Sequence, residues 1–169
     1  MFKKCTVYDL DQNVFQEINK HWMLITAQKP DGTINTMTAS WGAMGELWGT
    51  ETVTVYIRQS RYTKEFVDAQ DYFTISLFDG YRKELGLLGT KSGRDGDKIA
   101  EAGFHSITLD SQPAFAESKC VLICRKLYQD DIRLEDMSEA IRTKWYADGD
   151  YHTMYIGEIV GCYVREDHH

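Results

Sequence analysis

Residues 52–63 read Thr52-Val53-Thr54-Val55-Tyr56-Ile57-Arg58-Gln59-Ser60-Arg61-Tyr62-Thr63. Over the first seven residues, β-branched apolar side chains alternate with the others, which predicts a strand with one buried face. The segment Arg58–Thr63 then ends this strand and opens a helix over 64–70, with Thr63 as its candidate N-cap. Both the fold class and one candidate binding site are inferred from this strand-to-helix corner.

Other segments also have the apolar and β-branched patterns of strands. They are residues 22–28, 34–40, 72–78, 120–128 and 152–164. The first two flank Lys29-Pro30-Asp31-Gly32, where Pro and Gly are placed as a type I turn prefers, so they predict a hairpin. Gly157 and Gly161 interrupt the longest segment, and glycines inside a strand predict a bulge or a sharp coil.

Helical signals are short. Asp95 is a candidate N-cap for a helix that runs through Ala102 and ends at Gly103, and residues 81–88 and 136–145 are further candidates. The chain shows no strand–helix–strand rhythm, no GxGxxG fingerprint and no GxxxxGK[ST] loop. We therefore predict a mainly β (α+β) fold, an antiparallel β-barrel with short peripheral helices.

Length and charge limit the function classes. The 169 residues fit one domain, which we expect to span 1–169. The formal net charge of −7 argues against nucleic acid or an anionic membrane as partner, although a few local cations can still hold one phosphate. No apolar h-region follows Met1–Cys5 and no later apolar run is long enough to span a bilayer, so we expect a soluble, cytoplasmic protein.

The four cysteines are Cys5, Cys120, Cys124 and Cys162, and they form no CxxC pair. On one strand Cys120 and Cys124 would lie roughly 13 Å apart, too far for a disulfide or a shared metal. We expect buried free thiols and no metal site. We assign no role to His168 and His169.

Two segments carry cations that suit a phosphate group. Arg58–Thr63 brings two guanidinium groups, hydroxyls and the free N–H groups of a helix start together, which matches a dianionic phosphate. Residues 90–98 add Lys91, Ser92 and Arg94, with glycines that let the backbone approach an anion. When each segment is considered alone, Arg58–Thr63 has a solvated turn as its alternative interpretation, and residues 90–98 have a flexible polar loop.

Two further features could serve a bound ligand: one could bind a flat ring, and the other could donate or transfer a proton. Small residues precede Trp41 in Asn35–Gly42, so a ring can lie against this strand end with the Thr38 and Ser40 hydroxyls at its edge. A packed strand end with a core Trp is the alternative. His152 opens the last strand and is a candidate hydrogen-bond donor or proton shuttle, with a structural histidine as the alternative.

Taken together and in this order, these motifs resemble the flavin reductase-like FMN-binding split-barrel family, and most closely its flavoredoxin-type members. The similarity runs over nearly the whole chain, through residues 22–27, 35–42, 58–63, 72–76, 91–95 and 152–158. The resemblance implies a homodimer of antiparallel split β-barrels, with FMN near the subunit interface.

The resemblance also implies the residues around the FMN. The ring would lie against Thr38, Ala39, Ser40 and Trp41. The phosphate would lie at the corner of Arg58, Ser60, Arg61, Tyr62 and Thr63, helped by Lys91, Ser92 or Arg94. An Asn that contacts the flavin in related reductases corresponds to Ser76, and His152 matches the His near the reacting face in relatives that use NAD(P)H.

The expected function is an FMN oxidoreductase that moves electrons from NAD(P)H or a redox partner through bound FMN. One alternative is a flavoredoxin-like electron carrier that does not use NAD(P)H efficiently. Another is pyridoxamine phosphate oxidase-like chemistry on a related barrel. The sequence contains no nicotinamide-specific motif that separates these possibilities.

Overall fold

The computed structural model describes residues 1–166, so His168 and His169 lie outside the described residues. In chain order the strands are β1 (Phe2–Cys5), β2 (Met23–Gln28), β3 (Ile34–Ala39), β4 (Gly42–Leu47), β5 (Thr50–Arg58), β6 (Tyr72–Leu77), β7 (Ser106–Leu109), β8 (Gln112–Phe115), β9 (Cys120–Asp131) and β10 (His152–Arg165). The helical elements are η1 (Val7–Asp9), α1 (Val14–Gln16), η2 (Glu17–His21), α2 (Tyr62–Asp68), α3 (Arg82–Thr90), α4 (Lys98–Glu101), η3 (Leu134–Asp136) and α5 (Glu139–Trp145).

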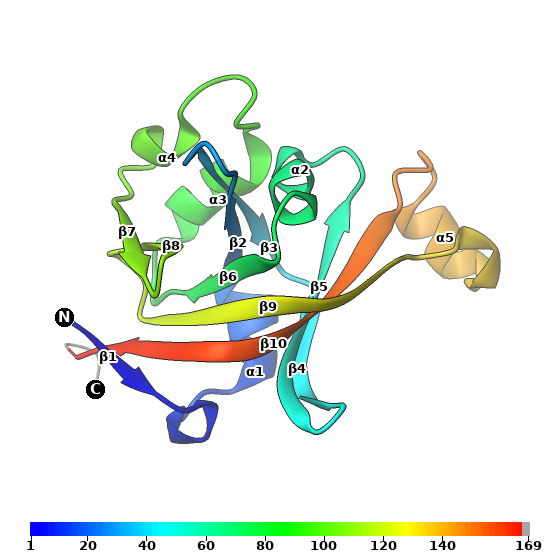
Figure 1. The fold of residues 1–169 in the computed structure, drawn as a ribbon. Coiled ribbons are helices and arrows are strands. Elements are labelled where there is room, and N and C mark those ends of the chain that lie inside the picture. The colour runs from blue at the N-terminus through cyan, green and yellow to red at the C-terminus, as the bar shows by residue number, and fades with distance from the viewer. Residues whose placement is uncertain (167–169) are drawn as a thin grey trace.

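One antiparallel sheet of eight strands forms the body of the protein (Figure 1). Its order is β3-β2-β6-β9-β10-β5-β4, with β1 paired to β10, while β7 and β8 form a separate hairpin. The sheet coils, and within residues 1–166 its two end strands, β3 and β4, do not pair with each other. The prediction of a mainly β, antiparallel fold with short peripheral helices is confirmed.

Strand β10 joins the two halves of the sheet. Its first half pairs with β5, its second half pairs with β1, and β9 follows its other edge. The register against β9 shifts between Ile156 and Gly157 and again between Ile159 and Gly161, so the predicted bulges are confirmed. At Gly157 an added Cβ would lie 2.8 Å from Cζ of Phe73 and 2.9 Å from Cβ of Cys124.

The chain between β9 and β10 leaves the barrel and returns to it. In Figure 1, α5 projects beyond the ends of these strands, and none of its residues is buried. The backbone N–H of Ile132 donates to the carbonyl of His152 at 2.9 Å, which closes the base of this excursion.

Two main apolar clusters hold the sheet in place. The inner cluster fills the barrel with fully buried side chains that include Ile25, Val53, Val55, Ile57, Phe73, Ile75 and Tyr155. The outer cluster covers the other face of β2 and β6 with residues of α3 and β8, namely Leu24, Phe78, Leu85, Leu88, Phe104 and Phe115. The apolar side chains that alternate along residues 52–58 therefore face the inner cluster, as predicted.

Two helix starts differ from prediction. Helix α2 begins at Tyr62 without a side-chain cap, because the predicted cap Thr63 is buried and accepts a hydrogen bond from Nδ2 of Asn35 at 2.8 Å. Helix α4 is capped by Asp97, whose carboxylate accepts from the N–H of Ala100, and not by Asp95. The predicted stop at Gly103 is confirmed by its φ of +72°.

The cysteines are free thiols, as predicted, and all except Cys5 are buried. Cys5 and Cys162 oppose each other on β1 and β10, with 3.2 Å between the sulfur atoms. Burial raises the pKa of Cys5 to about 12, so its thiol is protonated at neutral pH. In residues 1–166 no His, Cys, Asp and Glu side chains gather as a metal site, and none of the helices there is long and apolar enough to cross a membrane.

The bulge at Gly157 gives a stability prediction. Gly157→Ala should lower the free energy of unfolding by about 1–3 kcal/mol, because the new methyl group overlaps Phe73 and Cys124. The matched control is Gly45→Ala on β4, where an added Cβ meets nothing within 4 Å. Urea unfolding measures both changes, and equal midpoints for the two variants would contradict the close approach at Gly157.

Candidate functional site

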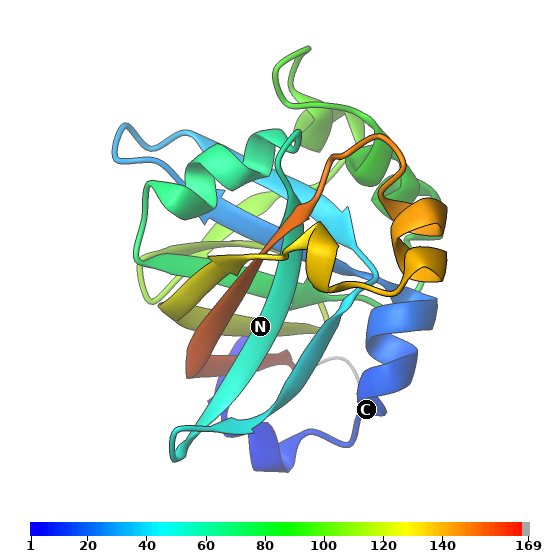
Figure 2. The ribbon, with the colours of Figure 1, turned by 90° about the vertical axis from the view of Figure 1, so that its right-hand side faces the viewer.

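A cleft of about 380 Å³ lies where β3 ends and β10 begins. It is lined by Met37, Thr38, Ala39, Ser40, Trp41, Tyr56, Arg58, Arg61, Trp145 and His152. These residues come from β3 and the turn after it, from β5 and the corner that follows, from α5 and from the start of β10. Figure 2 shows the orange α5 on the same side of the barrel as the end of β3.

Three rings form one wall of the cleft. The Trp41 ring meets the edge of Trp145 at 5.0 Å between centroids and at an interplanar angle of 88°. The His152 ring lies 5.1 Å from Trp41 on a tilted plane. A wall of this kind offers a flat apolar surface with a polar ring nitrogen beside it.

His152 is neutral at physiological pH. The residue is only 7% exposed, and burial is the main reason why its pKa falls to about 4. The positive charges of Arg58 and Arg61 lower this pKa further, and Asp150 opposes them. The imidazole can therefore serve the cleft as a hydrogen-bonding group without adding a charge.

Arg58 fastens the α5 excursion to the barrel. Its Nη1 donates to the carbonyl of Asp150 at 2.5 Å, and its Nη2 donates to the carbonyl of Trp145 at 3.0 Å. The guanidinium carbon also lies 5.2 Å from the centroid of the Tyr146 ring. One side chain at the end of β5 thus holds both ends of the turn between α5 and β10.

Arg61 and Lys98 place two positive charges beside the cleft. Nη1 of Arg61 donates to the carbonyl of Gly89 at 2.7 Å, and Nζ of Lys98 donates to the carbonyls of Leu88 and Lys91 at 2.8 and 2.9 Å. Lys98 is 5% exposed, and burial, followed by the charge of Arg61, lowers its pKa to about 8. Within residues 1–166 neither cation forms an ion pair with a carboxylate, although the charge of Asp150 acts on Arg61, so an anion placed here would offset the repulsion between the two cations.

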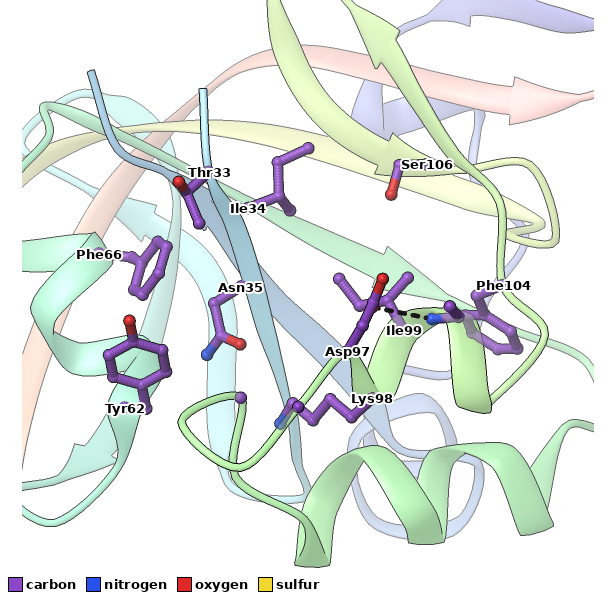
Figure 3. A pocket seen from close by; sticks show the side chains of 13 residues that line it. Thr33, Ile34, Asn35, Tyr62, Phe66, Asp97, Lys98, Ile99, Phe104 and Ser106 are labelled. Carbon is purple, nitrogen blue, oxygen red and sulfur yellow. Dashed lines mark hydrogen bonds between the residues drawn. The ribbon is translucent and has the colours of Figure 1, made fainter. Parts of the chain in front are cut away.

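Lys98 lines a second cavity of about 490 Å³, which is shown in Figure 3. In the figure Asn35 stands between the Tyr62 and Phe66 rings on one side and the chain of Lys98 on the other. The loop before α4 passes so close to β3 that a Cβ at Gly93 would overlap Oδ1 of Asn35. Only glycine lets this loop lie against the strand.

Comparison with known proteins identifies the family. Residues 15–169 match the family described as "Flavin reductase like domain". The chain belongs to the flavin reductase-like family. No curated protein sequence matches it.

Solved structures with the same fold include two flavoredoxins. The flavoredoxin of Desulfovibrio vulgaris (Miyazaki F) has a TM-score of 0.69 and 21% identity, over 98% of this chain and 78% of that one. The flavoredoxin of Methanosarcina acetivorans has a TM-score of 0.68 and 20% identity, over 86% and 68%. An FMN-binding domain of a flavin reductases-like enzyme from Shewanella baltica OS155 has a TM-score of 0.69 and 15% identity, over 97% and 77%. At these identities the likeness shows the fold, which is that of FMN-binding split barrels.

In this flavin reductase-like chain, half of the predicted site residues line the cleft. They are Thr38, Ala39, Ser40, Trp41, Arg58, Arg61 and His152. The hydroxyl of Thr38 donates to the carbonyl of Leu85 at 2.5 Å and so ties β3 to α3. Tyr62 lines the second cavity instead, where its ring packs against Phe66 with 5.0 Å between centroids.

The remaining predicted residues lie outside both cavities. The backbone N–H and the hydroxyl of Ser60 both donate to the Asp150 carboxylate, at 3.1 and 2.6 Å. Lys91 pairs with Glu101, and Arg94 pairs with Glu65 at 2.5 Å. The Ser92 hydroxyl accepts from the N–H of Arg94, while Thr63 bonds to Asn35.

Ser76, the position that corresponds to the Asn of related reductases, lies apart from the cleft residues. It is fully buried on β6, opposite Leu24 of β2 and Val121 of β9, and it lines neither cavity. Its hydroxyl has no hydrogen-bond partner within residues 1–166. The strand that carries Ser76 runs through the middle of the sheet, away from the edge where the cleft opens.

Sequence reasoning missed several residues of the site. Tyr56 and Trp145 line the cleft, and Asn35 and Lys98 line the second cavity. Asn35 lies within the Asn35–Gly42 segment that the sequence analysis singled out, but nothing in that segment marks it apart from the neighbouring Thr residues. Lys98 carries no usable signal either, since its sequence context does not distinguish it from Lys91 a few residues earlier.

Proposed function

We propose that this chain binds FMN, with the phosphate held by Arg61 and Lys98 and the ring system in the cleft beside Trp41 and His152. Bound FMN would exchange electrons with NAD(P)H or with a redox partner. The observation that carries the proposal is a pair of cations, neither in an ion pair with a carboxylate of residues 1–166, at a cleft lined by aromatic rings.

The residues present fit such a ligand at both ends. At the phosphate end, Arg61 lines the cleft and the positive charge of Lys98 lies close to it. At the ring end, the cleft volume of about 380 Å³ falls in the range typical of ligand sites. The cleft therefore combines positive charge, hydroxyl groups and aromatic rings, which suit a phosphorylated ring compound.

The chemistry divides between the cofactor and the protein. FMN supplies hydride and electron transfer when it is bound. The chain's part is to orient the ring against Trp41, to offer the neutral imidazole of His152 to it, and to keep water from its covered face. Because His152 carries no charge, it can hydrogen-bond to the ring without electrostatic cost to the nearby arginines.

The phosphate assignment predicts a preference for FMN over riboflavin. Lys98→Met should weaken FMN binding about 10- to 100-fold, because it removes a charge-assisted hydrogen bond, and should change riboflavin binding little. Wild-type affinity for FMN should fall as the pH rises through about 8, where free Lys98 loses its proton. Titration by flavin fluorescence measures both effects.

The control for this experiment is Lys126→Met. Lys126 is also partly buried, its Nζ donates to the carbonyl of Val67 at 2.9 Å, and burial lowers its pKa, but it lines neither cavity. This variant should keep the affinity for FMN and its pH dependence. If the wild type bound FMN and riboflavin with equal affinity, the proposal that Arg61 and Lys98 hold the phosphate would be wrong.

One observation favours the electron carrier as a second candidate. Trp145 lies edge-on against Trp41 and lines the cleft, so in this conformation α5 takes up space that a second bound ring would need. A carrier needs no space for a second ring. Two of the structures with the same fold are flavoredoxins, which agrees with this possibility.

Anaerobic stopped-flow reduction separates a reductase from a carrier. If the chain is a reductase, NADH or NADPH should bleach the flavin absorbance of the holoprotein rapidly. His152→Ala should then slow that step about tenfold or more, while FMN affinity changes little because the phosphate contacts lie elsewhere. A wild type that only dithionite reduces would contradict the reductase and support the carrier.

We also propose that two copies associate through the N-terminal face. Phe15 and Tyr8 are 86% and 80% exposed, and they adjoin an apolar groove lined by Val7, Leu10, Val14, Met44, Leu122 and Ile159. Exposed aromatic residues beside such a groove are typical of an interface. Sedimentation of the holoprotein should give a dimer that Phe15→Glu weakens, and a strict monomer would contradict this proposal.

A further inference from the structure

His152 makes a buried contact that the proposed function does not explain. Tyr146 follows the last residue of α5, and His152 opens β10, and they are 6% and 7% exposed. The Tyr146 hydroxyl lies 2.8 Å from Nδ1 of His152, and the two rings are perpendicular with 5.5 Å between centroids. This is a direct hydrogen bond between two titratable side chains.

Both groups are neutral at physiological pH. Burial raises the pKa of Tyr146 and lowers that of His152. Arg58 of β5 faces both groups, while Arg61 of the corner and Asp150 of the excursion act on His152, and Tyr56 faces Tyr146. The net effect on His152 favours the uncharged imidazole. In this form one ring nitrogen carries a proton and the other can accept a hydrogen bond.

The phenol is the donor of this bond. The Tyr146 hydroxyl has no other hydrogen-bond partner within residues 1–166. If Nδ1–H donated instead, the phenol proton would be left without an acceptor in a buried place, which costs more than the bond contributes. With the phenol as donor, Nδ1 accepts and the imidazole proton must lie on Nε2.

Nε2 is the nitrogen that remains for a ligand. It makes no hydrogen bond within residues 1–166, and it is not among the buried polar atoms that lack a partner there, so it is accessible. His152 lines the cleft, so this nitrogen is available to a ring bound there. A proton on Nε2 therefore gives the cleft a hydrogen-bond donor.

We propose that Tyr146 is a positioning residue, whose hydroxyl holds His152 in the Nε2–H tautomer and so directs a hydrogen-bond donor at an acceptor atom of the bound ring. The identity of that ring rests on the proposed function, whereas the tautomer does not. Arg58 supports the arrangement, because it holds the carbonyls of Trp145 and Asp150 on either side of Tyr146.

The tautomer can be measured without any cofactor. Long-range ¹H–¹⁵N NMR of the histidine-labelled apoprotein distinguishes a protonated from an unprotonated ring nitrogen, and His152→Ala assigns the signal. We expect a protonated Nε2 and an unprotonated Nδ1 for His152 near neutral pH. A protonated Nδ1, or an equal mixture of tautomers, would overturn the proposal.

Tyr146→Phe tests the cause. The variant should populate both tautomers and raise the pKa of His152 by roughly 0.5 to 1 unit, since the lost bond stabilised the neutral ring. Tyr151→Phe is the matched control, because the Tyr151 hydroxyl lies 3.5 Å from Asp131 and not on His152. Unchanged tautomer and pKa in Tyr146→Phe would overturn the proposal. If Tyr146→Phe does not fold, the tautomer measured for His152 in the wild-type apoprotein decides the proposal on its own.

The holoprotein adds a functional test. Tyr146→Phe should slow flavin reduction in the wild-type background and have no further effect in the His152→Ala background, because Tyr146 acts only through His152. Additive effects would contradict a positioning role. If no FMN binds at all, the proposed function fails while the NMR result on the apoprotein still stands.

Discussion

The pairing of β10 with β5 determines where every group of the cleft lies. His152 is opposite Arg58 in that ladder, so the first residue of one strand meets the last residue of the other. The bulges at Gly157 and Gly161 let β10 follow β9 on one edge while its other edge passes from β5 to β1. A slip of one residue would turn His152 to the opposite face and leave Arg58 beside a different backbone segment.

The strands could be predicted where one face is buried and the other is not. Val53, Val55 and Ile57 alternate for this reason, and glycine inside the last strand marks its bulges. Strand β4 could not be predicted, because Gly42, Gly45 and mostly exposed side chains leave no alternation. The helix start at Thr63 was wrong because a hydrogen bond from Asn35, distant in the chain, outweighs the local preference for capping.

The site residues carried by strand ends could also be predicted, because a sheet brings those ends to one edge. The residues Thr38–Trp41, Arg58 and His152 meet in this way. The loop cations could not be sorted from the sequence. Lys91 and Arg94 meet Glu101 and Glu65 at the surface, while the similar Lys98 turns inward and meets carbonyl groups. Only the folded chain shows that Lys98, within the described residues, forms no ion pair with a carboxylate.

The bond from Ile132 to His152 closes the base of the excursion formed by residues 133–151. The length and composition of this excursion are therefore separated from the register of the strands, since changes outside the closing bond need not be transmitted to β9 and β10. The excursion nevertheless supplies Trp145 and Tyr146 to the cleft. Natural variation or protein engineering can thus reshape one wall of the cleft and leave the opposite wall intact, so the shape of the cleft can diverge on a constant scaffold.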